Sequence, residues 1–277
     1  MPIRKRYQYE GHGLLVEGAK VGRLNMGINT NFIIYRIGSR LIDTGPANQW
    51  KFAKQFITEK PVSELWITHH HEDHSGNAQR ISELFDIVPF APIQAADKLK
   101  NGYKTPFFQS LIWGKPQKLK RMQPLPEQLE LEDGSPVIPV HTPGHAKDLT
   151  CFYLPKQKWF FSGDLYLAKT LKLMRSDENL ELLMQSIKKA LQYDFEVLFC
   201  PHKGIEEDGY NCLSEKLSNL VKICQDAQAH QQQGKSLEDI TLEMLGPKEP
   251  VDKLSGGNIS KENLIREALK VDLSQFT

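Results

Sequence analysis

The most informative stretch of this chain is Thr68-His69-His70-His71-Glu72-Asp73-His74-Ser75-Gly76-Asn77, which holds four of the nine histidines in six consecutive positions. The apolar run at residues 64–68 that leads into it is typical of a buried strand, and residues 78–85 carry apolar side chains at helical spacing. We therefore expect the cluster on a loop between the carboxyl end of a strand and the start of a helix. In open α/β sheets, ligands bind at that position.

The residue types in this stretch are those of a metal site, since imidazole and carboxylate groups are common zinc ligands. His69 and His71 are two residues apart in an extended segment, so their side chains project the same way and can hold one ion. Asp73 and His74 follow where the chain turns and can reach a second ion beside the first. The alternative is a solvated histidine-rich loop. It is less consistent with the buried strand, because burying so many titratable groups without a cation costs free energy.

The composition excludes several classes of protein. The 277 residues fit one large domain, or one domain with a small appendage, and 40% hydrophobic residues suffice for a substantial core. A net charge of +1 gives no general attraction to nucleic acid or to an anionic membrane. We see no apolar run long enough for a transmembrane helix and no signal peptide. The four cysteines lack CxxC spacing, so a reducing, cytoplasmic location is expected.

Strand and helix patterns alternate along the rest of the chain. We expect strands at residues 32–37, 40–43, 87–91, 136–141, 149–154, 158–161 and 196–200, and helices at 48–58, 93–99, 178–192, 211–233, 237–245 and 263–270. These patterns divide the chain into a domain at 1–210 and a helical extension at 211–277 that packs on the same domain.

Residues 101–123 interrupt this alternation. They contain Tyr103, Phe107, Phe108 and Trp113 with five basic residues and no acid. Long irregular segments in compact domains tend to be lids or binding loops. We interpret this one as a lid that binds an apolar or anionic substrate, with a surface loop or helix pair as the alternative.

Three further metal-ligand residue types stand at the ends of expected strands, namely His145, Asp164 and His202. Each lies beside Gly or Pro, where the chain turns. A lone histidine at a strand end is more often structural. With the four donors of the first stretch, however, these residues make a set of seven, which is the composition of a two-metal hydrolytic centre.

These motifs together resemble the metallo-β-lactamase-fold hydrolases, a superfamily that includes glyoxalase II-like thioesterases and N-acyl homoserine lactone lactonases. The matching residues are Asp43-Thr44-Gly45, His69-x-His71-x-Asp73-His74, Thr142-Pro143-Gly144-His145, Ser162-Gly163-Asp164 and His202, in the order of the family. The resemblance implies an α/β (α+β) fold, a four-layer αββα sandwich of two mixed β-sheets flanked by helices, with a helical C-terminal tail.

The resemblance also implies a role for each matching residue. The first metal ion is held by His69, His71 and His145; the second is held by Asp73, His74 and His202; Asp164 bridges the two. Asp43 supports the ligands from behind, and Asp73 acts in catalysis by orienting the nucleophile and passing on a proton. His70 and Glu72 occupy variable positions and are expected to point elsewhere. Zinc is the first choice of metal, although iron and manganese also fit the ligands.

The function implied is hydrolysis of a small ester, lactone or thioester by a hydroxide that bridges two metals, with a small molecule as partner and a homodimer left open. Phosphodiesterase activity, a persulfide dioxygenase with one iron, and a non-catalytic metal-binding sensor are the alternatives. Lactonases of the family carry a tyrosine three residues after the bridging aspartate, where this chain has Leu167. Candidate substrate-binding residues are Tyr166, Phe107, Phe108 and Trp113. Among the basic residues, Lys147, Lys169, Lys172 and Arg175 either serve an anionic substrate or are solvated surface charges.

Overall fold

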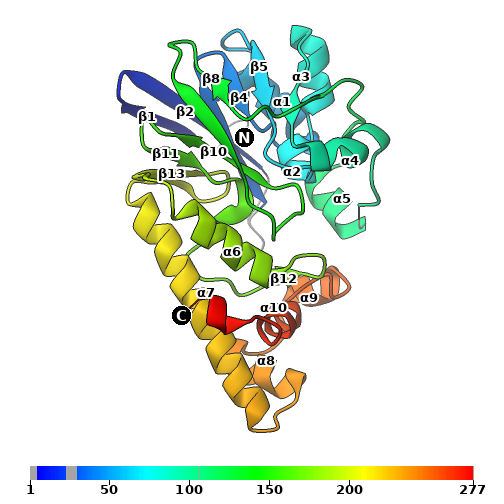
Figure 1. Cartoon of the computed structure of the whole chain (residues 1–277). Coiled ribbons are helices and arrows are strands. Elements are labelled where there is room, and N and C mark those ends of the chain that lie inside the picture. Colours follow the sequence, from blue (N-terminus) through cyan, green and yellow to red (C-terminus); the bar gives the residue numbers. More distant parts are fainter. Residues whose placement is uncertain (1–4, 23–29, 106, 277) are drawn as a thin grey trace.

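The structure is a computed structural model that describes residues 5–22, 30–105 and 107–276, apart from the side chain of Phe108. Two mixed β-sheets pack face to face, and helices cover their outer faces (Figure 1). The predicted αββα sandwich is therefore confirmed. No helix among the described residues is long and apolar enough to cross a membrane.

The first sheet is antiparallel in its N-terminal half and parallel beyond β4. Its strands, in spatial order, are β1 (Lys5–Gly11), β2 (Leu14–Gly22), β3 (Asn31–Ile37), β4 (Arg40–Ile42), β5 (Glu64–Trp66), β6 (Phe90–Ala91) and β7 (Gln123–Pro124). The parallel half is joined by helical crossovers, as parallel strands require.

The second sheet is antiparallel except for the parallel pairing of β11 with β13. Its strands, in spatial order, are β14 (Gly204–Glu206), β13 (Val197–Cys200), β11 (Trp159–Phe161), β10 (Thr150–Leu154), β9 (Pro136–His141) and β8 (Leu129–Glu130). A separate two-stranded ribbon pairs β12 (Met174–Arg175) with β15 (Ile259–Ser260).

Three apolar clusters correspond to the three interfaces of the sandwich. The central one lies between the sheets and is rich in aromatic side chains, including Trp66, Trp159 and Phe199. A second cluster joins the first sheet to its covering helices, which are α1 (Trp50–Ile57), α3 (Ala78–Phe85) and α4 (Ala96–Asn101). The third joins the second sheet to α6 (Leu180–Ala190), α7 (Gly209–Gln232), α8 (Leu237–Leu245) and α10 (Lys261–Ala268).

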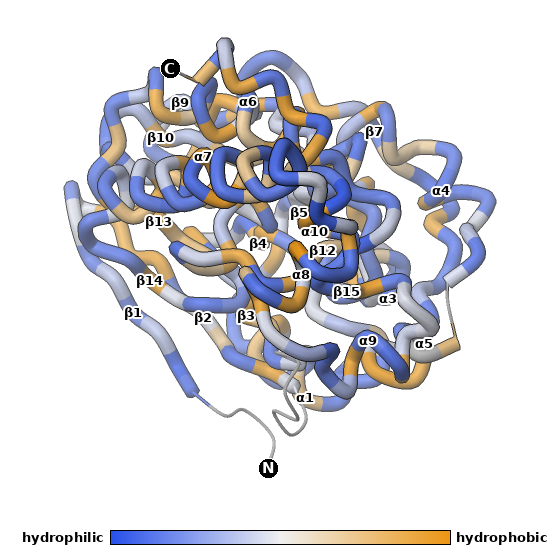
Figure 2. Tube along the Cα trace, turned by 90° about the horizontal axis from the view of Figure 1, so that it is seen from below, coloured by the Kyte–Doolittle hydropathy of each residue, from blue (hydrophilic) through white to orange (hydrophobic). Residues whose placement is uncertain are grey.

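The C-terminal helices pack on the second sheet through one face of the long helix α7. Its buried residues include Leu213, Leu220 and Ala227, which recur at the spacing of one helix face. In Figure 2, hydrophobic and hydrophilic residues alternate along the tube of α7, as expected for an amphipathic helix. Ser236 caps the start of α8, because its hydroxyl accepts a hydrogen bond from the Asp239 N–H at 3.1 Å. The division of the chain at residue 210 stays a prediction.

Some elements were not expected from the sequence. Strands β1 and β2 form the edge of the first sheet, and β1 carries mostly exposed or half-exposed polar side chains, so its hydrophobic pattern is weak. Residues 101–123 contain a short helix, α5 (Phe107–Trp113), and α9 (Pro250–Leu254) lies in the C-terminal region. Short 3₁₀ turns occur at η1 (Ala47–Gln49), η2 (Ile93–Ala95), η3 (Gly163–Leu165) and η4 (Leu273–Gln275).

One glycine fixes how the loop after β9 approaches helix α6. Gly144 has φ +139°, and a Cβ at this position would lie 2.4 Å from the backbone N and Cα of Leu183. Only a residue without a side chain allows this contact. The contact orients His145, the next residue in the chain.

We predict that Gly144→Ala destabilises the protein by at least about 3 kcal/mol, because it adds a steric clash to an unfavourable φ. Gly134→Ala is the matched control, since Gly134 also has a positive φ (+76°) but no atom lies within 4 Å of the added Cβ. It should cost only about 1 kcal/mol. Denaturant unfolding of both variants measures the difference, and equal losses would contradict the importance of the contact.

Candidate metal centre

The seven candidate ligands come from five places in the chain and meet at one edge of the sandwich. His69 and His71 follow β5, and Asp73 and His74 lie in α2 (Glu72–Ser75). The other three follow strands of the second sheet: His145 after β9, Asp164 in η3 after β11, and His202 after β13. The edge therefore combines donors from both sheets, as the strand-end positions in the sequence predict.

The first group contains one donor atom from each of His69, His71, His145 and Asp164, all within 4.8 Å of one another. His71 Nδ1 lies 2.9 Å from His69 Nε2 and 3.0 Å from His145 Nε2. His145 Nε2 lies 3.0 Å from Asp164 Oδ2. Ligand atoms around a tetrahedral zinc ion lie about 3.3 Å apart, given bonds of about 2.0–2.1 Å. The spacing of this group is close to that value.

The second group contains Asp73, His74 and His202, again with donor atoms within 4.8 Å. His202 Nε2 lies 3.4 Å from Asp73 Oδ2 and 3.3 Å from Asp164 Oδ1. Asp164 Oδ1 is also 3.1 Å from His74 Nε2. The two oxygens of Asp164 thus face different groups, Oδ2 the first and Oδ1 the second.

Two of these donors are buried without a hydrogen-bond partner of acceptable geometry among the described residues. They are His74 Nε2 and Asp164 Oδ1. An unsatisfied buried polar atom costs about 1–3 kcal/mol, and more when the group is charged. A cation placed between the donors removes that cost, so the donor set fits divalent metal ions.

Supporting residues hold the outer nitrogens of the histidines. Asp43 Oδ2 lies 2.7 Å from His74 Nδ1, and its Oδ1 accepts a hydrogen bond from the Thr68 N–H at 2.8 Å. Asp43 adopts φ +58°, a left-handed conformation that turns its carboxylate under the cluster. Such partners fix the orientation of a ligating imidazole and raise its basicity. Asp43 thus contacts a candidate ligand from outside the donor groups, which is where the sequence places it.

Sequence reasoning missed two other supporting groups. Glu178 Oε1 lies 2.9 Å from His145 Nδ1, and the carbonyl oxygen of Asn31 lies 2.9 Å from His202 Nδ1. Glu178 comes from the segment before α6, where an acidic residue is ordinary, so its position gave no signal. A backbone carbonyl has no sequence signature at all.

The pKa values of the donors reflect burial opposed by charge. Burial lowers the pKa of His69 and His71 well below the usual value of histidine, and the charges of His74 and Arg175 respectively add to the effect. Burial also lowers the pKa of His145, but Glu178 and Asp164 outweigh it and raise the net value to about 9. Burial raises the pKa of Asp164, yet the surrounding histidines hold it well below the usual range of a carboxyl group. Asp164 is therefore ionised at neutral pH.

The pattern of the metallo-beta-lactamase superfamily matches residues 28–202, which is more than half of the chain. The chain belongs to this superfamily. A metallo-beta-lactamase family protein of known structure from Thermus thermophilus shares the fold, with a TM-score of 0.68, 15% identity, and coverage of 92% of this chain and 93% of that one.

Two curated relatives align with this chain over only about half of their own length. An atrochrysone carboxyl ACP thioesterase from Aspergillus fumigatus is 26% identical over 70% of this chain and 56% of its own length. A hydroxyacylglutathione hydrolase from Bartonella tribocorum is 25% identical over 50% of this chain and 48% of its own length. The chain thus spans about half the length of the curated relatives it matches.

His70 and Glu72, which the superfamily resemblance assigns to variable positions, belong to neither donor group. His70 turns away from the cluster, and its Nδ1 lies 2.7 Å from Asp148 Oδ1. Asp148 Oδ2 also accepts a hydrogen bond from the His70 N–H at 2.7 Å. Glu72 is buried, and burial raises the pKa of its carboxyl group. Although it belongs to neither donor group, Glu72 lines the cavity beside them, which differs from the expectation that it points elsewhere. His141 is half-exposed, and its Nε2 lies 2.9 Å from the Lys147 carbonyl oxygen.

A cavity of about 260 Å³ adjoins the donor groups, and five of the seven candidate ligands face it. Its apolar wall consists of Ile112, Trp113, Leu167, Leu173 and Ile259. The expectation that residues 101–123 border the pocket is therefore confirmed, since α5 supplies part of this wall. Whether α5 opens and closes as a lid stays a prediction.

The candidate substrate-binding residues have different positions. Trp113 lines the cavity, with its ring centroid 6.4 Å from that of His202. Tyr166 does not line it, because its side chain is buried in the cluster beneath the second sheet, and Leu167 faces the cavity instead. Phe107 is 85% exposed and also lies outside the cavity lining. The side chain of Phe108 is outside the described residues.

Arg175 is the basic residue of the predicted set that reaches the cavity. Its guanidinium forms an ion pair with Asp177, with Nε 3.1 Å from Oδ1. Lys169 instead pairs with Glu215 at the surface, at 2.7 Å, and Lys147 and Lys172 are exposed. The carboxylates of Glu72 and Glu178 line the same cavity.

We predict that Asp43→Asn weakens zinc binding about 10–100-fold, because the amide no longer supplies the negative charge behind His74. Competition with a chromophoric chelator measures the affinity.

Asp148→Asn is the matched control. Asp148 is also a buried carboxylate that contacts one histidine ring and one backbone N–H, but that histidine is His70, which belongs to neither donor group. This variant should bind zinc within about threefold of the wild type. Equal weakening by both substitutions would show that general loss of stability, and not support of His74, explains the effect.

Proposed function

We propose that the protein is a hydrolase that uses two divalent metal ions to cleave a small carboxylic ester, lactone or thioester. The observation that carries the proposal is the position of Asp164, whose two oxygens face two separate groups of donors. A lone structural histidine cluster would not need a carboxylate shared between two sets of imidazoles.

In this proposal His69, His71 and His145 hold the first ion, and Asp73, His74 and His202 hold the second, with Asp164 between them. When bound, such ions lower the pKa of water towards neutrality and polarise the oxygen of the scissile carbonyl. Zinc is the first choice, because imidazole and carboxylate ligands at these spacings suit it. Manganese and iron also fit.

The residues of the chain then orient the reactants. Asp73 faces the cavity, so its carboxylate is placed to orient the attacking water and to pass a proton to the leaving group. Asp43 and Glu178 hold the rings of His74 and His145 in fixed orientations. The apolar wall that includes Trp113 and Leu167 excludes bulk water from one side of the reacting group.

The cavity supports a small acyl substrate. A volume of about 260 Å³ with an apolar wall suits a short acyl chain or a lactone ring. Two of the similar proteins are named as a thioesterase and a hydroxyacylglutathione hydrolase, which favours thioesters within this class.

We predict that the protein, reconstituted with zinc or manganese, binds about two metal ions per chain and hydrolyses simple thioesters or lactones. Removal of the metal with a chelator should abolish hydrolysis, and its return should restore it. Elemental analysis and a thiol-release assay measure the two quantities. Fewer than one metal ion per chain would contradict the proposal. One iron per chain in the protein before reconstitution would favour the dioxygenase alternative.

Two variants test the assignment of residues. Asp164→Ala should reduce metal content at both positions, because both groups lose a donor. His70→Gln should keep the metal content of the wild type, since glutamine retains an N–H donor for Asp148. Equal loss in the two variants would mean that the assignment of ligands is wrong.

A further inference from the structure

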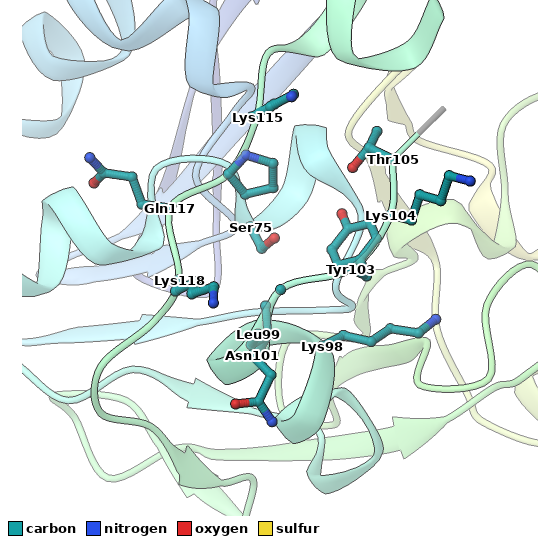
Figure 3. Close-up of a pocket in the computed structure, with 12 residues that line it drawn as sticks. Ser75, Lys98, Leu99, Asn101, Tyr103, Lys104, Thr105, Lys115, Gln117 and Lys118 are labelled. Carbon is teal, nitrogen blue, oxygen red and sulfur yellow. The ribbon is translucent and has the colours of Figure 1, made fainter. Parts of the chain in front are cut away.

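A second pocket, separate from the metal centre, lies beneath the segment that carries α5. We propose that this pocket binds a phosphate group, either free or carried by a larger molecule. We call it the lysine pocket, because residues 98–99, 101–105 and 115–118, together with Ser75, line it and contribute Lys98, Lys104, Lys115 and Lys118. Figure 3 shows Lys115, Gln117 and Lys118 on one side of the pocket and Tyr103, Lys104 and Thr105 on the other, with Ser75 between them.

The charge of the lysine pocket is not balanced by the protein. Its lining includes four lysines and no acidic residue. Among the described residues, no carboxylate lies within 4.0 Å of the ammonium group of any of the four, whereas other surface lysines such as Lys60 and Lys120 have such partners. Like charges gathered around one hollow repel each other, and a bound anion removes that repulsion.

One of the four lysines is held in place. The Nζ atom of Lys98 lies 2.9 Å from His70 Nε2 and 6.0 Å from the centroid of the Tyr103 ring. Because neither of these partners is a carboxylate, the positive charge of Lys98 remains available to a ligand. The other three lysines are exposed, so their flexible side chains can close around an anion in several arrangements.

Uncharged groups in the pocket supply additional hydrogen-bond donors. The Thr105 hydroxyl and the Gln117 amide line the pocket and have no hydrogen-bond partner within the described part of the chain. A phosphate offers several acceptor oxygens and combines favourably with ammonium, hydroxyl and amide donors. The combination of four positive charges with such donors favours phosphate over a single carboxylate.

The size of the pocket indicates a ligand larger than inorganic phosphate. Its volume is about 520 Å³, twice that of the cavity at the metal centre. Pockets for small organic ligands fall in the range of about 300–1,000 Å³. A phosphate ester or pyrophosphate with an attached organic group would fill it.

The same segment of chain connects the two pockets. Residues 98–99, 101–105 and 115–118 line the lysine pocket, while Gln109, Ile112 and Trp113 of the intervening α5 line the cavity at the metal centre. The Tyr103 hydroxyl also donates a hydrogen bond to the His70 carbonyl oxygen at 3.0 Å. An anion in the lysine pocket therefore holds both ends of the segment that forms a wall of the other cavity.

The first experiment is a calorimetric titration of the metal-loaded protein with pyrophosphate at low salt. Lys115→Gln with Lys118→Gln should weaken binding at least tenfold, because it removes two of the four charges. Lys51→Gln with Lys54→Gln removes the same charge from exposed positions on α1 and should change binding less than about twofold. Metal-free protein is titrated in parallel, since pyrophosphate also binds metal ions, and the difference between the double variants should persist there.

Equal affinities in the two double variants would overturn the proposal, as would no binding by the wild type at about 5 mM pyrophosphate. Circular dichroism and thermal unfolding confirm that each variant is folded. Lys104→Gln with Lys115→Gln is a second pocket variant and should weaken binding similarly. The titration does not depend on hydrolysis, so an inactive protein that binds pyrophosphate in this pocket refutes the proposed function and leaves the phosphate site intact.

A second experiment distinguishes the two sources of the phosphate. If the phosphate is part of the substrate, the KM for a phosphate-bearing thioester such as an acyl-coenzyme A should be at least fivefold higher in the Lys115/Lys118 double variant than in the wild type. The kcat for that substrate and the KM for the same acyl group on cysteamine should stay unchanged. If the phosphate belongs to a separate ligand, the KM values of both thioesters should be the same in the variant as in the wild type, while pyrophosphate binding remains sensitive to the double substitution.

Discussion

The position of Asp164 between two groups of imidazoles is the constraint on which the rest of the site depends. Its carboxylate is buried and ionised, with His145 at 3.0 Å on one side and His74 at 3.1 Å on the other. Buried charges are stable only when they are paired or bind a cation. This requirement explains why so many titratable groups gather at one edge of an otherwise apolar sandwich, and why carboxylates such as Asp43 stand behind the imidazoles.

The αββα sandwich is suited to meet this constraint because each layer contributes to the same edge. The aromatic core between the sheets fixes their relative position, so residues that follow β5 in one sheet and β11 and β13 in the other converge. Tight turns then aim the side chains. Asp43 adopts a left-handed conformation, and the contact of Gly144 with Leu183 sets the loop of His145. The precision of the site therefore comes from packed strands and constrained turns.

Much of this arrangement was predictable from the sequence, because strand-end turns and metal-ligand residue types coincide there. The seven candidate ligands were expected at the ends of strands, and the structure brings all seven together. Strands β1 and β2 were missed. For β1, the outermost strand of the sheet, the reason is that its mostly exposed or half-exposed side chains give no clear hydrophobic pattern. Tyr166 was placed in the cavity by its position near Asp164, whereas the chain direction after η3 turns it into the core and leaves Leu167 at the cavity wall. The contact of Glu178 with His145 and the lining of the lysine pocket both bring together segments that are distant in the sequence. A local sequence pattern does not predict such contacts.

Anomalous X-ray diffraction from crystals of the zinc-loaded protein would show whether one metal ion lies on each side of Asp164. We expect two anomalous peaks per chain, one among His69, His71 and His145 and the other among Asp73, His74 and His202, each within bonding distance of one oxygen of Asp164. Peaks at other residues, or no peak at this edge of the sandwich, would contradict this expectation.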